Sequence, residues 1–196
     1  MDDAGARARI RNIIDSETTA YFSDAELDEF LKMATDEFIQ QYYMGFETTQ
    51  DSRDKLSDLV ISSEEDINDA TPLSISSLDD GELEYGRFLS AYVKASPNVN
   101  VKVIQISDIN AYLNDPFNKA DANNPVIYFK EGKIHSIGFS VTTKLIITYL
   151  QYTTEYTELN DTTHEEVCQI AARKVLATLG DPRYQMVQAE IAERRA

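Results

Sequence analysis

Cysteine, histidine and glycine are scarce in this 196-residue chain, and tryptophan is absent. A lone cysteine, Cys168, excludes an internal disulfide, and we expect it to be a buried structural thiol. The only two histidines, His135 and His164, do not form a paired zinc-binding motif. The seven glycines are too scattered for a phosphate-binding loop. We therefore predict neither a metal nor a cofactor.

Long apolar runs and positive charge are also in short supply. There is no stretch of about 20 apolar residues, as a membrane-spanning helix requires, and the first residues lack the apolar core of a signal peptide. The sequence therefore predicts an intracellular protein without a membrane segment. Its 34 acidic and 18 basic side chains give a net charge of −16, which disfavours ordinary nucleic-acid binding. Solubility alone explains this charge equally well.

The clearest helix of the sequence begins at Ser23. The motif Ser23-Asp24-Ala25-Glu26 is a capping box, in which the serine and glutamate side chains each satisfy a backbone N–H at the helix start. Phe22 stands where a hydrophobic staple is expected, and apolar side chains recur at helical spacing to about Tyr43. Because Gly45 then offers a stop, we predict an amphipathic core helix from residue 24 to about residue 43. Residues 51–60 are expected to add one or two turns.

A shorter helix is expected over residues 2–14. Alanines and isoleucines favour a helix there, and interleaved arginines give it a basic side. That side either seats against an acidic neighbour in an assembly or is a solvated helix face. The end of the following helix is polar and aromatic, which suits either ordinary surface or a partner-facing edge. The candidate residues for contact between subunits are Arg7, Arg9, Arg11, Tyr42 and Tyr43.

The middle of the chain changes from helical to strand-like patterns. Ser62–Gly81 is acidic and rich in serine, which predicts an exposed loop with at most one short strand at Leu73–Ser77. Strand-forming residues then dominate from Tyr85 to Val103, with a turn at Ser96-Pro97-Asn98.

A hairpin is predicted further along, with strands Val126–Lys130 and Lys133–Ile137 and the turn Glu131-Gly132. A short helix over residues 107–113 precedes this hairpin, and an apolar strand from Lys144 to Tyr152 follows it. We expect these strands to form one antiparallel sheet of about four to six strands.

The last strand leads through a polar link into a second core helix. One of residues 161–163 is expected to cap its start, where Glu165 and Glu166 favour the positive end of the helix dipole. Apolar side chains then recur at steps of three and four: Val167, Ile170, Ala171, Val175, Leu176 and Leu179. Gly180 is expected to end the helix, and Pro182 to begin another.

These elements predict an α+β fold, a helical bundle with an inserted antiparallel β subdomain. We expect a single domain built from four stretches. They are N-terminal helices at 1–60, an acidic loop at 61–82, the β subdomain at 83–152, and a C-terminal core helix and arm at 160–196.

Motifs that carry chemistry are missing from the sequence. Gly81 and Gly86 have the outer spacing of a phosphate-binding loop, but Arg87-Phe88 stands where lysine and a hydroxyl residue are required. We therefore predict a protein that is not an enzyme. The alternative is a small acidic metal-dependent hydrolase that uses carboxylates of the 62–81 stretch, Asp79 and Asp80 among them.

The order of the parts carries a resemblance. The arginine-bearing helix is followed by FSDAELDEFL, strands, ISDINAYLNDPFNKADANNPVIYF, the strand LIITYLQY and the terminal THEEVCQIAARKVLATLGDPRYQ. In this order the chain resembles a head-to-tail connector, or neck ring, protein of tailed bacteriophages. Residues 163–185 match the family's pattern of a His-Glu-Glu start and a Gly-Asp-Pro-Arg-Tyr-Gln corner, and the likeness extends over most of residues 20–190.

This resemblance implies a non-catalytic structural virion protein. Such proteins form homo-oligomeric rings, commonly dodecameric, that join the portal protein to tail components or further neck rings. The ring is assembled in the host cytoplasm and surrounds the DNA exit channel in the neck of the virion, with DNA as non-specific cargo. The family's C-terminal segment commonly contacts the portal, and the candidate residues here are Pro182, Arg183, Tyr184, Gln185, Val187, Ile191, Arg194 and Arg195. A different virion or cytoplasmic interaction module is a further alternative.

Overall fold

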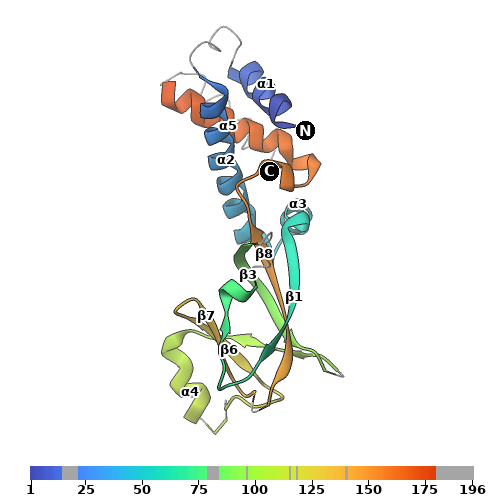
Figure 1. Cartoon of the computed structure of the whole chain (residues 1–196), viewed down its shortest axis with the longest axis vertical. Coiled ribbons are helices and arrows are strands. Elements are labelled where there is room, and N and C mark those ends of the chain that lie inside the picture. The colour runs from blue at the N-terminus through green and yellow to red at the C-terminus, as the bar shows by residue number, and fades with distance from the viewer. Residues whose placement is uncertain are drawn as a thin grey trace. The chain divides into compact units, whose positions relative to one another are not determined.

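The computed structural model describes residues 1–14, 22–78, 84–95, 97–114, 116–117, 119–139 and 141–179. They form two compact units, a helical unit and a β unit (Figure 1). The helical unit contains the described residues of Met1–Leu59 and Thr153–Ala196, whereas the β unit is Val60–Tyr152. The helices of the first and the antiparallel strands of the second confirm the predicted α+β class.

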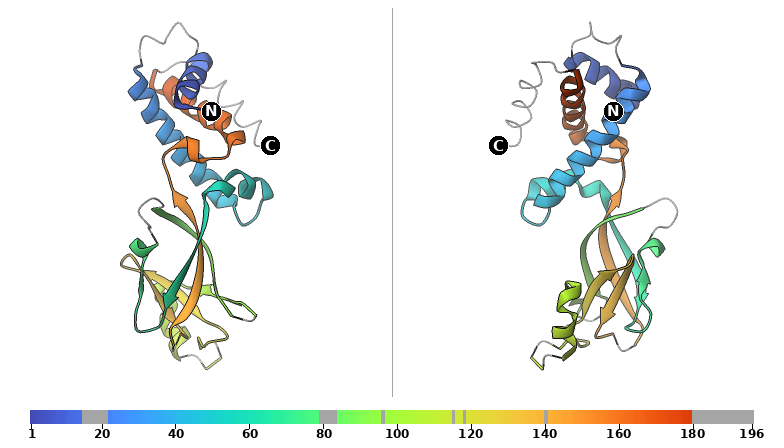
Figure 2. Two further views of the ribbon diagram at one scale, coloured as in Figure 1. Left: turned by 45° about the vertical axis from the view of Figure 1, so that its right-hand side comes forward. Right: turned by 90° about the vertical axis from the view of Figure 1, so that its left-hand side faces the viewer.

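Three helices make up most of the helical unit. They are α1 (Asp3–Ile14), α2 (Asp24–Gly45) and α5 (His164–Leu179). Both α1 and α2 lie against α5 (Figure 2). After α2 come a short helix, α3 (Gln50–Lys55), and a single turn at Ser57–Leu59, which matches the turns expected over residues 51–60.

The start of α2 is the predicted capping box. The Ser23 hydroxyl accepts a hydrogen bond from the Glu26 N–H at 3.3 Å, and the Glu26 carboxylate accepts one from the Ser23 N–H at 2.8 Å. The preceding Phe22 packs edge-on against Phe30, with ring centroids 5.8 Å apart. The local sequence therefore fixes where α2 begins.

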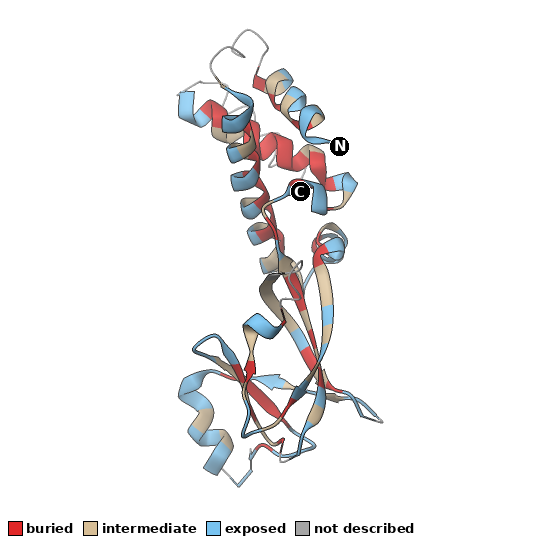
Figure 3. Ribbon diagram, viewed as in Figure 1, coloured by how far each residue is buried: buried red, intermediate tan, exposed pale blue. Residues whose placement is uncertain are grey.

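The core of the helical unit lies between the apolar faces of the three helices, drawn red in Figure 3. Each helix contributes side chains at steps of three and four residues, as an amphipathic helix does. The fully buried ones include Ala6, Ile10, Leu27, Ala34, Phe38, Val167, Ile170, Ala171, Val175 and Leu176. The helix α5 begins at His164, close to the start that the sequence predicts at residues 161–163. A single turn at Asp161–Thr163, capped by Asn160, leads into it.

The β unit contains two four-stranded sheets instead of the single sheet predicted. The first has the order β1 (Val60–Ile67), β8 (Thr143–Tyr152), β3 (Glu84–Val93) and β4 (Val99–Asn100). The second has the order β2 (Leu73–Ser74), β7 (Lys133–Ile137), β6 (Val126–Lys130) and β5 (Lys102–Val103). A shared apolar core joins the sheets and includes Ile67, Ile127, Ile134, Leu145, Ile147 and Tyr149.

The strands that the sequence predicts to form one sheet belong to two different sheets. The segment from Val99 to Val103 leaves the first sheet as β4 and enters the second as β5, which pairs in parallel with β6. The predicted short helix follows β5 as a turn at Ile106–Asp108 and α4 (Ile109–Asn114). The composition of so short a segment contains no signal for this change of partner.

The largest error concerns the acidic stretch predicted as a loop at 61–82. Its first part is β1, an eight-residue strand paired along its whole length with β8. Serine and carboxylate side chains alternate between the two sides of this strand, and only Ile67 is fully buried. Between Ile61 and Ile67 this edge strand has none of the apolar residues by which strands are recognised. The expected strand at Leu73–Ser77 is shorter, β2 followed by a turn at Ile75–Ser77, and residues 79–83 lie outside the described residues.

The predicted hairpin is confirmed residue for residue. Val126–Lys130 pairs with Lys133–Ile137, and Glu131 and Gly132 form the turn with φ of +52° and +70°. Two residues with positive φ are the requirement of the tight turn whose twist matches that of the strands.

One carboxylate ties together two loops of the β unit. Asp69 accepts hydrogen bonds from the Ser136 hydroxyl at 3.1 Å and from the N–H groups of Gly138 and Phe139 at 3.1 and 2.9 Å. Its own N–H donates to the Phe139 carbonyl at 3.0 Å. Gly138 is required there, because its φ is +102° and a Cβ atom would lie 2.7 Å from the Asp121 carbonyl oxygen.

We expect Asp69→Ala to destabilise the β unit by about 2 kcal/mol, because three donors lose their acceptor. Amide hydrogen exchange in β6 and β7 should accelerate by roughly 30-fold. The matched control is Asp66→Ala, which removes an exposed carboxylate paired with Lys144 at 3.0 Å and should cost below about 1 kcal/mol. Equal effects of the two substitutions would contradict the role assigned to Asp69.

Candidate functional site

The arginines proposed for subunit contact all form ion pairs inside the helical unit. Arg7 binds Asp28 of α2 at 2.9 Å, and Arg11 pairs with Asp24 of the same helix. The hydrogen bond from Arg11 lowers the pKa of the Asp24 carboxyl. On the other side of α1, Arg9 binds Glu165 of α5. These ion pairs explain the alternating arginines without a second subunit. Contact between these arginines and a neighbouring subunit stays a prediction.

Tyr42, the first of the two candidate tyrosines, is a core residue rather than part of an exposed edge. It is 6% exposed, its ring lies 4.7 Å from that of Phe38, and its hydroxyl donates to Glu166 at 2.8 Å. Because Tyr42 follows Phe38 by four residues, it continues the apolar stripe of α2. That spacing was the sequence signal for its burial. Tyr43 points to the neighbouring side and is half-buried.

A buried charged network joins α2, α3 and α5 through Tyr42. The Lys55 ammonium donates to the Tyr42 hydroxyl at 2.6 Å and to the Glu166 carboxylate at 3.0 Å. The side chains of Lys55 and Glu166 are 21% and 10% exposed, so the ion pair is largely shielded from water. Burial alone would lower the pKa of Lys55, but the hydrogen bonds with Tyr42 and Glu166 outweigh it and raise that pKa. Burial raises the pKa of Tyr42.

A second ion-pair cluster fixes the far end of α5 to α2. The Glu37 carboxylate pairs with Arg173 and, at 2.6 Å, with Lys174. Burial alone would raise the pKa of Glu37, but these hydrogen bonds outweigh it and the pKa lies below its usual value. Sequence reasoning found neither this cluster nor the Lys55–Glu166 pair, because the partners lie more than a hundred residues apart and no local pattern links them.

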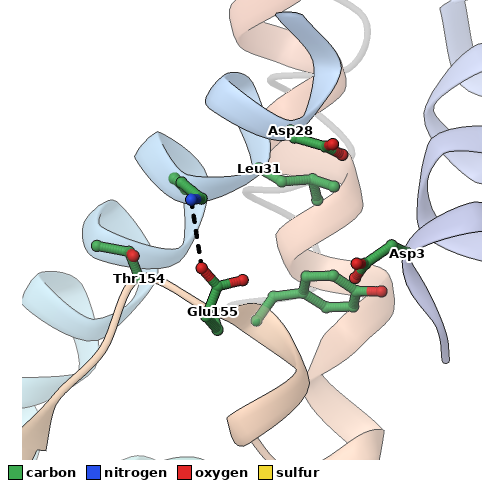
Figure 4. Close-up of a pocket in the computed structure, with 7 residues that line it drawn as sticks. Asp3, Asp28, Leu31, Thr154 and Glu155 are labelled. Carbon is green, nitrogen blue, oxygen red and sulfur yellow. Dashed lines mark ion pairs between the residues drawn. The ribbon is translucent and has the colours of Figure 1, made fainter. Parts of the chain in front are cut away.

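One pocket of the helical unit gathers acidic side chains beside α2 (Figure 4). Its volume is about 170 Å³, and it is lined by Asp3, Asp28, Leu31, Lys32, Thr154, Glu155 and Tyr156. Lys32 pairs with Glu155 at 3.3 Å, and Arg7 pairs with Asp28. Burial, together with the nearby Asp3 carboxylate, raises the pKa of Tyr156. The charges around this pocket are thus largely engaged within the fold.

Of the residues weighed for metal or nucleophilic chemistry, His164 and Cys168 lie one turn apart in α5, whereas His135 lies in the β unit. Cys168 is buried in α5 as predicted, and burial raises the pKa of its thiol to about 11. His164 is buried against Tyr156, and its Nε2 atom lies 3.1 Å from the Leu159 carbonyl oxygen. His135 stacks on Tyr128 in the β unit. The described part of the chain contains no group of three potential metal ligands, and none of its helices is long and apolar enough to cross a membrane.

Several predicted residues lie outside the described residues. They are the alternative metal ligands Asp79 and Asp80, the helix-ending Gly180, and the portal-binding candidates Pro182, Arg183, Tyr184, Gln185, Val187, Ile191, Arg194 and Arg195. A search against models of known protein families gives no match, and a search of curated proteins gives none. The family resemblance therefore stays a prediction.

We expect Glu166→Ala to lower the free energy of unfolding of the helical unit by about 3 kcal/mol, because the Lys55 charge is left without its buried partner. The double substitution Lys55→Met with Glu166→Leu should recover at least half of that loss, since it removes both charges and keeps the volume filled. Chemical denaturation followed by far-ultraviolet circular dichroism measures both values. A loss that stays unchanged in the double variant would show that the ion pair is not its cause.

The lowered pKa of Glu37 makes its contribution depend on pH. Its ordinary pKa is 4.5, so the stabilisation is present above pH 4.5 and disappears as the pH falls through the lower folded-state value. We expect Glu37→Gln to cost about 1 kcal/mol at neutral pH and progressively less in acid. Thermal melts at a series of pH values test this. Glu47→Gln, the control for loss of an exposed carboxylate, should show no such convergence with the wild type.

Proposed function

We propose that this protein is a non-catalytic structural protein of a tailed bacteriophage, a connector that forms a ring between the portal and the tail components. The order of its parts carries the proposal. That order runs from an arginine-bearing helix through the Ser23-capped helix, strands and the hairpin segment to the helix that opens with His164-Glu165-Glu166. The resemblance rests on this succession, not on a catalytic motif.

The division into two units supports this proposal. A connector needs a rigid body that transmits geometry and a second surface that reaches other components, and it has no need of an active site. In this chain the helices from both sides of the insertion pack into one body, while residues 60–152 form a separate β unit. This arrangement agrees with the helical bundle and inserted β subdomain that the pattern of helices and strands in the sequence predicts.

The ion pairs of the helical unit also suit such a role. Arg9 links α1 to α5, Glu37 links α2 to α5, and Lys55 links α3 to α5. The helix α5, which precedes the C-terminal segment in the sequence, is thereby joined to α1, α2 and α3. A portal bound to residues 182–195 would therefore act on a chain whose preceding helix is joined to the rest of the helical unit.

The assembly that follows from this proposal is a homo-oligomeric ring in the neck of the virion. Its partners are the portal protein, tail or further neck proteins, and DNA that passes through without sequence-specific contact. The net charge of −16 fits a conduit to which DNA does not adhere, because carboxylates facing the channel would repel phosphates.

Native mass spectrometry of the full chain, alone and with the portal protein encoded in the same viral genome, tests this function. We expect a ring whose mass is a whole-number multiple of 22.2 kDa and which binds the portal. The double substitution Arg183→Ala with Tyr184→Ala should weaken the portal complex by about 10-fold or more, since arginine and tyrosine are typical interface anchors.

The control replaces a cation and an aromatic residue elsewhere. Lys119→Ala with Phe117→Ala removes two exposed side chains of the β unit and should leave portal binding unchanged. A chain that remains monomeric with the portal and instead binds Mg²⁺ or Mn²⁺ through Asp79 or Asp80 would reject the connector and favour a metal-dependent hydrolase.

A further inference from the structure

One face of the second sheet is cationic in an otherwise acidic protein. Strand residues that lie directly opposite each other share a face, and residues two apart along a strand do so as well. The side chains of one face are Lys102, Val126, Tyr128, Lys130, Lys133, His135 and Ile137. The charged residues among them are all lysines. We call the exposed end of this face, formed by Tyr128, Lys130, Lys133 and His135, the lysine face.

The lysine face retains two features that cost stability. Lys130 and Lys133 are direct partners across the hairpin, and like charges in that position repel each other. The turn between them places Glu131 at a φ of +52°, a conformation that a non-glycine residue adopts at a cost of about 1 kcal/mol or more. A salt bridge of 3.6 Å between Lys130 and Glu131 offsets this only in part, because both groups are exposed. Unfavourable local choices of this kind are typical of functional surfaces.

Aromatic rings complete the lysine face. Tyr128 and His135 stack with their ring centroids 5.0 Å apart and an angle of 12° between the planes. Both residues are half-buried, and Tyr128 packs against the small apolar cluster of Ile104, Ala120 and Val126. A flat aromatic pair next to two ammonium groups fits a partner that presents both carboxylates and apolar groups.

The helical unit carries a surface of the opposite character on the outer side of α2. Glu29, Met33, Asp36, Gln40 and Met44 follow one another at steps of four, three, four and four residues, so they line one side of the helix. We call this row the methionine face. Met33 and Met44 are 54% and 86% exposed, so both side chains are open to a partner. The carboxylates of Glu29 and Asp36 are exposed between them, and Gln40 donates to Asp36 at 2.7 Å.

We propose that the lysine face of one copy docks on the methionine face of a second copy. Lys130 and Lys133 would pair with Glu29 and Asp36, and Met33 would cover the Tyr128–His135 stack through contacts between sulfur and aromatic rings. This inference rests on the proposed ring, for which it supplies the contact between neighbours. Because the two faces differ, the contact is heterologous and repeats from copy to copy until the rotation closes.

Charge complementarity selects a second copy as the occupant. Each copy carries a net charge of −16, so copies repel each other unless cationic groups of one meet anionic groups of the next. A nucleic acid would meet the same two lysines, but the rest of the chain would repel its phosphates, and it offers no complement to Met33 and Met44. The experiment must therefore distinguish DNA binding from association between copies.

A charge-swap experiment tests the contact. The first variant carries Lys130→Glu and Lys133→Glu, and the second carries Glu29→Lys and Asp36→Lys. Each variant alone presents like charges at the contact, so we expect self-association to weaken by about 10- to 100-fold. In an equimolar mixture the two variants are complementary at every contact, and association should return towards the wild-type level. Sedimentation velocity and native mass spectrometry, with and without the portal protein, measure these changes.

The control for altered net charge is Asp54→Lys with Asp58→Lys, which reverses two exposed carboxylates in α3 and in the turn that follows it, outside the methionine face of α2. It should associate like the wild type. Circular dichroism spectra that match the wild type show that each variant is folded, as expected for substitutions of exposed side chains.

Three results would overturn the inference. The first is assembly of either charge variant at wild-type strength, the second is a mixture that does not recover, and the third is a wild type that stays monomeric with and without the portal. The first two leave the connector function intact, whereas the third also removes the ring. Loss of duplex DNA binding in the first variant without loss of association, measured by fluorescence anisotropy, would assign the lysine face to DNA instead.

Discussion

The helical unit depends on how a single carboxylate is accommodated in its interior. Ten of the sixteen residues of α5 are buried, and Glu166 is among them. A charge removed from water to this extent needs a cation at hydrogen-bonding distance. Lys55 supplies it from α3, and the Tyr42 hydroxyl supplies a further donor from α2. These contacts set where α2 and α3 lie relative to α5, so the apolar packing of the unit and the position of this one charge are coupled.

The two units differ in how their charged side chains are paired. In the helical unit the arginines of α1 and the cations of α5 are matched with carboxylates across helix interfaces, which leaves the surplus of negative charge on outward sides such as that of α2. In the β unit Lys94 and Lys144 neutralise acidic residues of β1, whereas the lysines of the hairpin stand opposite each other. The net charge of the protein therefore conceals local surfaces of either sign.

Signals that act over a few residues were read correctly from the sequence. The capping box at Ser23, the Glu131-Gly132 hairpin and the start of α5 all depend on neighbours along the chain. The features that were missed depend on distant partners. The middle of β1, Ser62–Asp66, is polar on both sides, and this strand is defined by its pairing with β8. The strands β4 and β5 are too short to reveal that they belong to different sheets. The polar residues beside Tyr42 indicate a surface position, whereas its spacing of four residues from Phe38 indicates the core, where its side chain lies. Lys55 and Glu166 are joined only by the tertiary fold.

The path by which the chain enters and leaves the β unit has an evolutionary consequence. The chain enters through β1 and leaves through β8, and these strands are antiparallel neighbours in which Val60 lies opposite Leu150. The two ends of the β unit are therefore close together, as they are in inserted domains that can be exchanged without disturbing their host. Related chains could keep the helical unit and its charged interior while losing, enlarging or replacing everything between Leu59 and Thr153. The two units are thus free to diverge at different rates, because each has a core of its own.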